Sequence, residues 1–256
     1  MSKIFRIFGP IVLNFLALEI ILIKPHLLWW MIGFMFTVTC IITFRSVRYD
    51  FRSLGPLNFL ILPNLLLIGA ILNLLLIADP VLRQILIIFY SLCFYISQDI
   101  LTRRVIPKVL GDKSETVSLH FRDSFIVTTT YFLICTGIWG FYFYLDLSSI
   151  QTCLLLLLAT VALFYQTLWQ ANLIFVQTWI YVLILGLIVT EVFWVISFWP
   201  IAFWVNASVL VIIFYVYRGL VWMYLQKAFG PRLLKEYLFV GFALLVILLL
   251  SAKWTL

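Results

Sequence analysis

Long apolar runs separated by short polar segments make up nearly the whole chain. A helix that crosses a bilayer needs about 20 mostly apolar residues, because each residue advances it by about 1.5 Å. Cutting the sequence where charged residues, Pro or Gly interrupt the runs gives nine such segments. The pattern therefore predicts an all-α, polytopic integral membrane helix bundle of about nine transmembrane helices, forming a single transmembrane domain over residues 1–256. The predicted spans are 5–23, 27–44, 57–78, 82–98, 124–145, 149–169, 175–198, 200–217 and 234–252.

The boundary between the sixth and seventh spans rests on the fewest polar residues. Residues 150–217 contain a single charged residue, Glu191, and at 68 residues they are long enough for three passes. We expect the chain to turn where amide side chains gather, with a polar vestibule as the alternative. These amides are Gln166, Gln170, Asn172 and Gln177.

The basic residues orient the spans, because Lys and Arg concentrate in cytoplasmic loops. With the N-terminus in the cytoplasm, 14 of the 17 basic residues fall inside, and only Lys24, Arg83 and Lys253 fall outside. An even number of spans would destroy this alternation. The charges therefore predict nine spans, a cytoplasmic N-terminus and a C-terminus outside. We expect 11 of the inner basic residues to form interfacial or docking surfaces: Arg45, Arg48, Arg52, Arg103, Arg104, Lys108, Arg122, Arg218, Lys227, Arg232 and Lys235.

Two segments are predicted to be the largest cytoplasmic loops, 98–123 and 218–234. Charged and apolar residues alternate in the first until Pro107 and Gly111 interrupt them, a pattern typical of a segment lying on anionic lipid. Docking of a partner and binding of a substrate phosphate are the alternatives. Residues 116–121 alternate with period two, which indicates an extended segment.

A short motif with the form basic-x-[Phe/Leu]-Gly-Pro occurs three times, at 6–10, 52–56 and 227–231. Gly permits a sharp turn, and Pro fits the first turn of a helix, where its missing N–H is not needed. The motif therefore predicts helix starts near the inner surface. A remnant of duplication or a shared docking feature is the alternative.

The composition excludes a water-soluble domain. The chain is 65% hydrophobic and 11% charged, whereas soluble domains contain roughly 45–50% apolar and about 25% charged residues. The net charge of +7 is then an orientation signal, and no nucleic-acid partner is expected. The four isolated cysteines are expected to be small buried apolar residues.

Familiar membrane-enzyme motifs are missing from the sequence. There is no HExxH motif, no serine elbow and no pair of Asp-rich motifs that would hold magnesium, and only His26 and His120 are present. No catalytic residue, metal ligand or cofactor is therefore predicted, and an enzyme is the least favoured reading.

Four polar residues lie in the outer halves of predicted spans. Intramembrane carboxylates are costly, about 2.5–3.5 kcal/mol for Asp at mid-span, so they need partners or roles. Glu19 and Glu191 lie roughly 7 and 12 Å below the outer surface by helix rise, and Asn73 and Asn206 lie at similar depths. One hypothesis is a shared ligand, ion or proton site. The alternative is structural: Glu19 reaches Lys24 or the headgroups, Glu191 is protonated and hydrogen-bonded to another helix, and the asparagines join helices.

Three functions remain open. The spans are rich in bulky side chains, with 24 Phe, 12 Tyr and 10 Trp, and poor in the small residues that help helices rock. This favours a noncatalytic membrane subunit that assembles with membrane proteins or specific lipids, or with copies of itself. The alternatives are a small transporter or channel subunit using Glu19 and Glu191, and an enzyme acting on a lipid-linked substrate. Anionic lipids at the cytoplasmic face are expected partners, and a bacterial-type plasma membrane is the favoured location.

Overall fold

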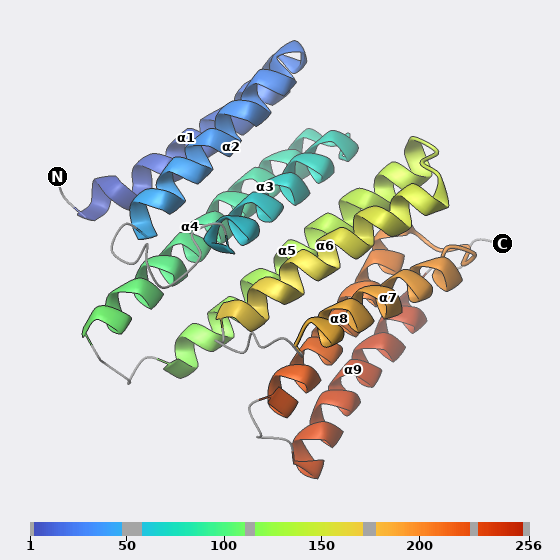
Figure 1. Cartoon of the computed structure of the whole chain (residues 1–256). Coiled ribbons are helices and arrows are strands. Elements are labelled where there is room, and N and C mark those ends of the chain that lie inside the picture. Colours follow the sequence, from blue (N-terminus) through green and yellow to red (C-terminus); the bar gives the residue numbers. More distant parts are fainter. Residues whose placement is uncertain (1–2, 48–57, 111–115, 171–177, 226–229, 253–256) are drawn as a thin grey trace. The chain divides into compact units, whose positions relative to one another are not determined.

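A computed structural model describes residues 3–47, 58–110, 116–170, 178–225 and 230–252. These residues form α-helices joined by short connections, with one 3₁₀ turn, η1 (Pro25–Leu27), and no strand among them (Figure 1). The all-α prediction is therefore confirmed for the described chain. The helices are α1 (Lys3–Ile23), α2 (Leu28–Val47), α3 (Asn58–Leu76), α4 (Pro80–Leu110), α5 (Thr116–Tyr144), α6 (Ser149–Gln170), α7 (Thr178–Ile196), α8 (Phe203–Leu225) and α9 (Pro231–Ser251).

Seven of the described helices, α3 to α9, are long and apolar enough to cross a membrane. The described parts of α1 and α2 add two shorter apolar stretches, Val12–Ile23 and Leu28–Thr43. The helices thus indicate a multi-pass membrane protein. The amides at Gln166 and Gln170 lie in the last turns of α6, and Asn172 and Gln177 lie outside the described residues.

The chain divides into two compact units, residues 1–130 and 131–256. In the first unit, α1 packs against α2 and α4, and α3 packs against α2 and α4. In the second unit, α6 packs against α7 and α8, and α8 packs against α7 and α9. The single-domain prediction concerns both units together and stays a prediction.

Aromatic side chains fill the core of the second unit. The rings of Tyr131 and Phe214 stack with centroids 4.1 Å apart, and the Trp139 and Phe193 rings lie 4.6 Å apart. All four side chains are fully buried. Aromatic pairs of this kind stabilise helix contacts beyond the area they bury, so the bulky residues of these spans pack against one another.

The contact between α8 and α9 instead depends on two glycines. A Cβ atom at Gly219 would lie 2.4 Å from the Tyr237 ring, and one at Gly241 would lie 2.4 Å from Val216 Cγ2. Each helix thus offers a glycine where the other places a bulky side chain, and the two backbones approach closely.

The Gly-Pro motif starts a helix at one site and fails to do so at another. Gly230 caps α9 and Pro231 is its first residue, as predicted. At 6–10 the prediction is wrong, because α1 begins at Lys3 and continues through Pro10. Membrane helices tolerate an internal proline where neighbouring groups satisfy the freed carbonyl. The third copy, at 52–56, lies outside the described residues.

Both predicted cytoplasmic loops are largely helical. Helix α4 continues through Pro107 to Leu110, and α5 begins at Thr116, so the extended segment predicted at 116–121 is wrong. Alternation over six residues is too short to outweigh the helical sequence that follows it. In the second segment, α8 reaches Leu225 and α9 begins at Pro231. The spanning helices therefore continue where the charge pattern predicted loops.

Candidate functional site

Glu19 is held by a neighbouring helix of the first unit. Its Oε2 atom accepts a hydrogen bond from Gln84 Nε2 of α4 at 3.2 Å, and the Glu19 side chain is half-buried. Helices α1 and α4 pack against each other. Glu19 therefore has a hydrogen-bond partner, Gln84, within its own unit, and not the Lys24 or headgroup contact that the structural alternative predicted.

Asn73 is buried in α3 and bonds to its own helix. Its Nδ2 atom donates to the Gly69 carbonyl oxygen, four residues earlier, at 2.7 Å. A side chain that bonds back in this way satisfies itself without a ligand.

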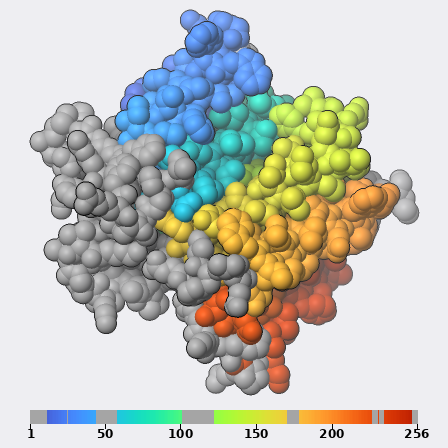
Figure 2. Space-filling model, in the orientation of Figure 1, coloured from blue at the N-terminus to red at the C-terminus, as the bar shows by residue number. Residues whose placement is uncertain are grey.

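Glu191 lies on the exposed face of α7. Leu187, Trp194 and Val195, its neighbours along this face, are each more than half exposed. Glu191 itself is exposed, and it makes no hydrogen bond or ion pair within the described structure. Figure 2 shows α7, in orange, at the surface. The carboxylate therefore projects away from the core of its unit, among apolar side chains.

Asn206 has the opposite environment. It lies in the first turn of α8, between the buried residues Val205 and Ala207, and is itself 0% exposed. Neither its Nδ2 nor its Oδ1 atom has a hydrogen-bond partner in the described structure. Asn206 is thus a buried amide whose bonding capacity is unused.

The four predicted site residues fall into two pairs. Glu19 and Asn73 belong to the first unit and bond to different partners, whereas Glu191 and Asn206 belong to the second. Within the second unit the exposed carboxylate and the buried amide lie in different environments. A shared site for all four residues therefore stays a prediction.

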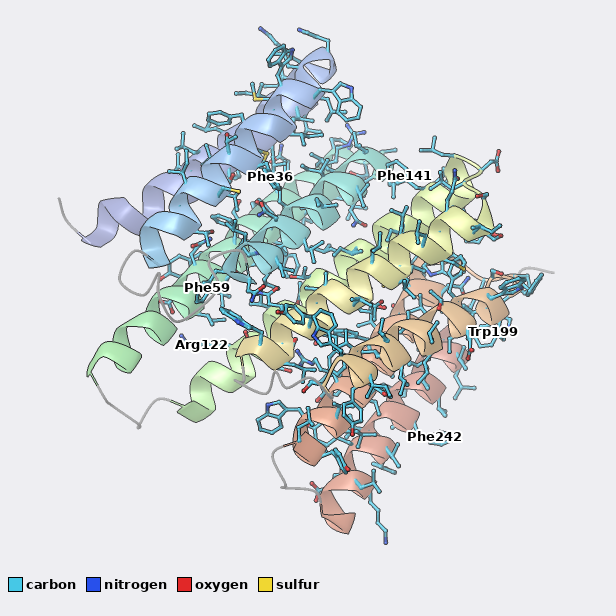
Figure 3. All side chains as sticks on the ribbon, in the orientation of Figure 1. Phe36, Phe59, Arg122, Phe141, Trp199 and Phe242 are labelled. Atoms are coloured by element: carbon cyan, nitrogen blue, oxygen red, sulfur yellow. The ribbon has the colours of Figure 1, made fainter. Side chains whose placement is uncertain are left out.

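The basic residues predicted to dock partners are mostly helical. Arg122 of α5, marked in Figure 3, is exposed, and its guanidinium lies 3.5 Å from the Asp99 carboxylate of α4. Such exposed pairs contribute little to stability. Lys235 of α9 is also exposed. Of the remainder, Arg45, Arg103, Arg104, Lys108 and Arg232 lie on α2, α4 and α9, and Arg48, Arg52 and Lys227 lie outside the described residues.

Arg218 corrects the prediction that placed it in a cytoplasmic loop. It lies within α8, is only 6% exposed, and its guanidinium carbon lies 6.0 Å from the centroid of the Phe214 ring. A guanidinium keeps its charge in proteins, so its burial requires favourable contacts, and an aromatic face supplies one. This arginine is therefore a buried residue of α8 and not part of a loop, and its docking role stays a prediction.

A buried polar group in the first unit was missed by the sequence analysis. Gln98 Nε2 of α4 donates to Thr43 Oγ1 of α2 at 3.3 Å, and Asn64 Nδ2 of α3 reaches Cys40 Sγ of α2 at 3.9 Å. All of these side chains are buried except Cys40, which is half-buried. The four-residue spacing of Thr39 and Thr43, one helical turn apart in an apolar run, is the signal that would have indicated it.

Acidic, histidine and cysteine side chains do not gather in the described chain. No group of three or more of them is placed to hold a metal ion in the part of the chain that the structure describes. The polar groups that do gather are neutral amides and hydroxyls.

One family model matches the chain over residues 10–251. The chain belongs to this family, described as a protein of unknown function (DUF5656). The match extends from α1 to the last residue of α9, so the family pattern includes every described helix. No curated protein and no solved structure matches the chain.

Proposed function

We propose that this protein is a noncatalytic integral membrane subunit that assembles with another membrane protein through the exposed face of α7. Glu191 is the observation that carries the proposal. It lies in a helix whose mean hydropathy is 2.3, and it points away from its own unit.

A lipid-exposed carboxylate is unfavourable at this position. An ionisable group in a spanning helix normally pairs with another group or lines a polar cavity. Glu191 has neither partner among the described residues, and its neighbours are Leu187, Trp194 and Val195. A partner helix with a Lys, Arg, Asn or Gln at the same depth would pair with the carboxylate and cover the apolar side chains around it.

Helix α9 offers a second exposed surface. Almost none of its apolar residues is buried, and Phe239, Phe242, Ile247 and Leu250 are each more than 60% exposed. Figure 3 marks Phe242 on this helix. Such a face can contact either lipid or a helix of another protein. It is compatible with the proposed assembly but does not distinguish lipid from a protein partner.

The transporter hypothesis has less support than the subunit hypothesis. Of its two carboxylates, Glu19 already accepts a hydrogen bond from Gln84, and Glu191 lies on an exposed face. A pathway enclosed by the second unit would not include that face. For the third hypothesis, an enzyme acting on a lipid-linked substrate, no catalytic residue was predicted.

The proposal includes an orientation. Nine spans with the N-terminus in the cytoplasm would place 14 of the 17 basic residues on the inner side of the membrane, where anionic lipids attract those that are exposed. The inner ends of α4 and α5 then face the cytoplasm, including the pair Arg122 and Asp99. A bacterial-type plasma membrane remains the predicted location.

Purification from native membranes tests the proposal. The tagged full-length chain is solubilised in mild detergent, and bound proteins and lipids are identified by mass spectrometry. We expect a stoichiometric membrane-protein partner with the wild type and at least a tenfold loss of that partner with Glu191→Leu, since about 1.4 kcal/mol of lost pairing changes binding tenfold. The yield of the variant should be unchanged or higher, because the substitution removes a carboxylate from an apolar face.

Glu19→Gln is the matched control. It alters the other intramembrane carboxylate, which has its partner inside the chain, and keeps an oxygen that can accept the Gln84 hydrogen bond. The partner should be retained. Equal recovery of the partner with wild type and Glu191→Leu would reject α7 as the assembly face.

A further inference from the structure

Several buried oxygen atoms of the first unit have no hydrogen-bond partner among the described residues, and three of them lie on neighbouring helices. These three are Thr39 Oγ1 of α2, Asn64 Oδ1 of α3 and Ser97 Oγ of α4. Thr39 and Ser97 are 0% exposed and Asn64 is 7% exposed. Buried polar atoms are almost always bonded to protein, water or an ion, because leaving them unpaired is costly.

Two contacts bring the three helices to one turn of α2. Asn64 Nδ2 reaches Cys40, and Gln98 Nε2 donates to Thr43, so α3 and α4 both meet α2 between residues 39 and 43. This turn is about 6 Å long. Ser97 directly precedes Gln98 on α4. The three unbonded oxygens therefore belong to helices that converge on the same short stretch.

The hydroxyl groups of Thr39 and Ser97 differ from several buried hydroxyl groups elsewhere in the described helices, which bond back to their own helix. Ser91 Oγ, six residues before Ser97 on α4, donates to the Ile87 carbonyl oxygen at 2.8 Å, and Thr160 and Thr167 bond back in the same way. That bond is the ordinary solution for a hydroxyl in an apolar helix. Thr39 and Ser97 do not make it, which leaves their oxygens available to another group.

The amide of Asn64 is fixed so that its oxygen remains open. Its Nδ2 atom donates to the Leu60 carbonyl oxygen at 2.8 Å as well as reaching Cys40. The nitrogen side of the amide is thus satisfied by α3 and α2. The carboxamide oxygen, on the opposite side of the group, has no partner.

We propose that Thr39, Asn64 and Ser97 bind a monovalent metal cation, Na⁺ or K⁺, between α2, α3 and α4. Hard cations take oxygen ligands, and neutral oxygens can replace the hydration shell of a monovalent ion inside a membrane protein. The three ligands carry no charge, which suits a single positive charge better than a double one, since divalent ions are usually held by carboxylates. Backbone carbonyl groups or retained water would complete the coordination.

Thermal unfolding of the purified full-length chain tests the site. The protein in mild detergent is measured in NaCl, KCl and choline chloride at the same ionic strength, because choline is much larger than either metal cation and cannot be coordinated by oxygen ligands in the same way. We expect the unfolding temperature in NaCl or KCl to be about 2–4 °C above that in choline, the stabilisation expected from a ligand that binds only the folded state. Binding of radioactive sodium or rubidium, a substitute for potassium, measures the same site directly.

Removing the two open hydroxyls should abolish the response. Thr39→Val and Ser97→Ala delete oxygens that bond to no protein atom, so both variants should fold, and the unfolding temperature should no longer distinguish the salts. Ser91→Ala is the matched control, because it removes a buried hydroxyl from the same helix whose partner is a carbonyl. It should keep the cation response.

Two results would overturn the proposal. Equal unfolding temperatures in all three salts, together with no binding of labelled cation, would assign the open oxygens to buried water. A cation response that survives in the double variant Thr39→Val/Ser97→Ala would place the ion elsewhere in the chain.

Discussion

At the scale of single residues, the donor and the acceptor can be assigned in the buried hydrogen bond between Tyr131 and Thr160. Tyr131 Oη of α5 and Thr160 Oγ1 of α6 lie 2.9 Å apart, and both residues are fully buried. Thr160 donates its own hydrogen to the Leu156 carbonyl oxygen at 2.7 Å. Tyr131 is therefore the donor to Thr160, while its ring stacks on Phe214.

Tyr131→Phe should destabilise the second unit by a small, measurable amount. The substitution keeps the stacked ring and removes one interhelical hydrogen bond, which in membrane bundles averages about 0.6 kcal/mol. Unfolding in mixed detergent micelles measures the change. A double-mutant cycle with Thr160→Val isolates the pair, and a coupling energy of zero would show that the two hydroxyls do not interact.

The sequence predicted how far along a helix a polar residue lies, but it did not predict on which side of the helix the residue lies. The depth of Glu191 follows from counting residues before Trp199, whereas its exposure depends on which side of α7 packs against α6 and α8. Helix α7 is apolar on all sides, so its periodicity does not distinguish a buried face from an exposed one. Arg218 was predicted to lie in a loop because its charge ends the apolar run, although α8 continues through it and buries it.

At the scale of helices, the apolar runs predicted the elements well because bilayer thickness sets their length. The predicted span 149–169 corresponds to α6 (Ser149–Gln170), and 57–78 corresponds to α3 (Asn58–Leu76). The errors lie at the C-terminal ends of α4 and α8 and at the N-terminal end of α5, where charged residues continue a helix. A charged residue ends the apolar run of a helix, but the hydrogen-bonded helix can continue beyond it.

The contact of α8 with α9 should fail when Gly219 receives a side chain. Gly219→Ala places a Cβ atom against the Tyr237 ring, which is half-buried and also stacks on Tyr215, so the ring or the helix must shift. We expect a loss of about 1–3 kcal/mol, the usual cost of overpacking. Disulfide crosslinking between cysteines introduced into α8 and α9 reports their separation, and its efficiency should fall.

Gly33→Ala is the control for this substitution, because a Cβ atom there meets no atom within 4 Å. It should leave the crosslink unchanged. Tyr237→Ala combined with Gly219→Ala should restore part of the contact by removing the ring that the new methyl group meets. If Gly219→Ala alone crosslinks as efficiently as the wild type, the close approach of the two helices is incorrect.

At the scale of the whole molecule, the helices indicate which segments can cross a membrane, and the charge distribution predicts the direction of each crossing. The structure describes seven helices that are long and apolar enough to span, together with the shorter apolar stretches of α1 and α2. The charge asymmetry adds the direction in which each would cross. If α1 and α2 both cross, the number of passes is odd and the chain ends lie on opposite sides.

Reporters fused at three positions therefore test the nine-span orientation. We expect the C-terminus after Leu256 and the connection between α5 and α6, residues 145–148, to lie outside, and residues 226–229 to lie in the cytoplasm. The reason is that Arg232 and Lys235 lie in the first two turns of α9 and Arg218 lies in the second half of α8, and basic residues favour the cytoplasmic ends of membrane helices. Alkaline phosphatase, active only outside, and green fluorescent protein, fluorescent inside, give opposite signals at each position. A cytoplasmic C-terminus together with residues 226–229 outside would contradict the predicted orientation of α8 and α9. The depth of Glu191 below the outer surface, on which the assembly face of α7 depends, would then be wrong as well.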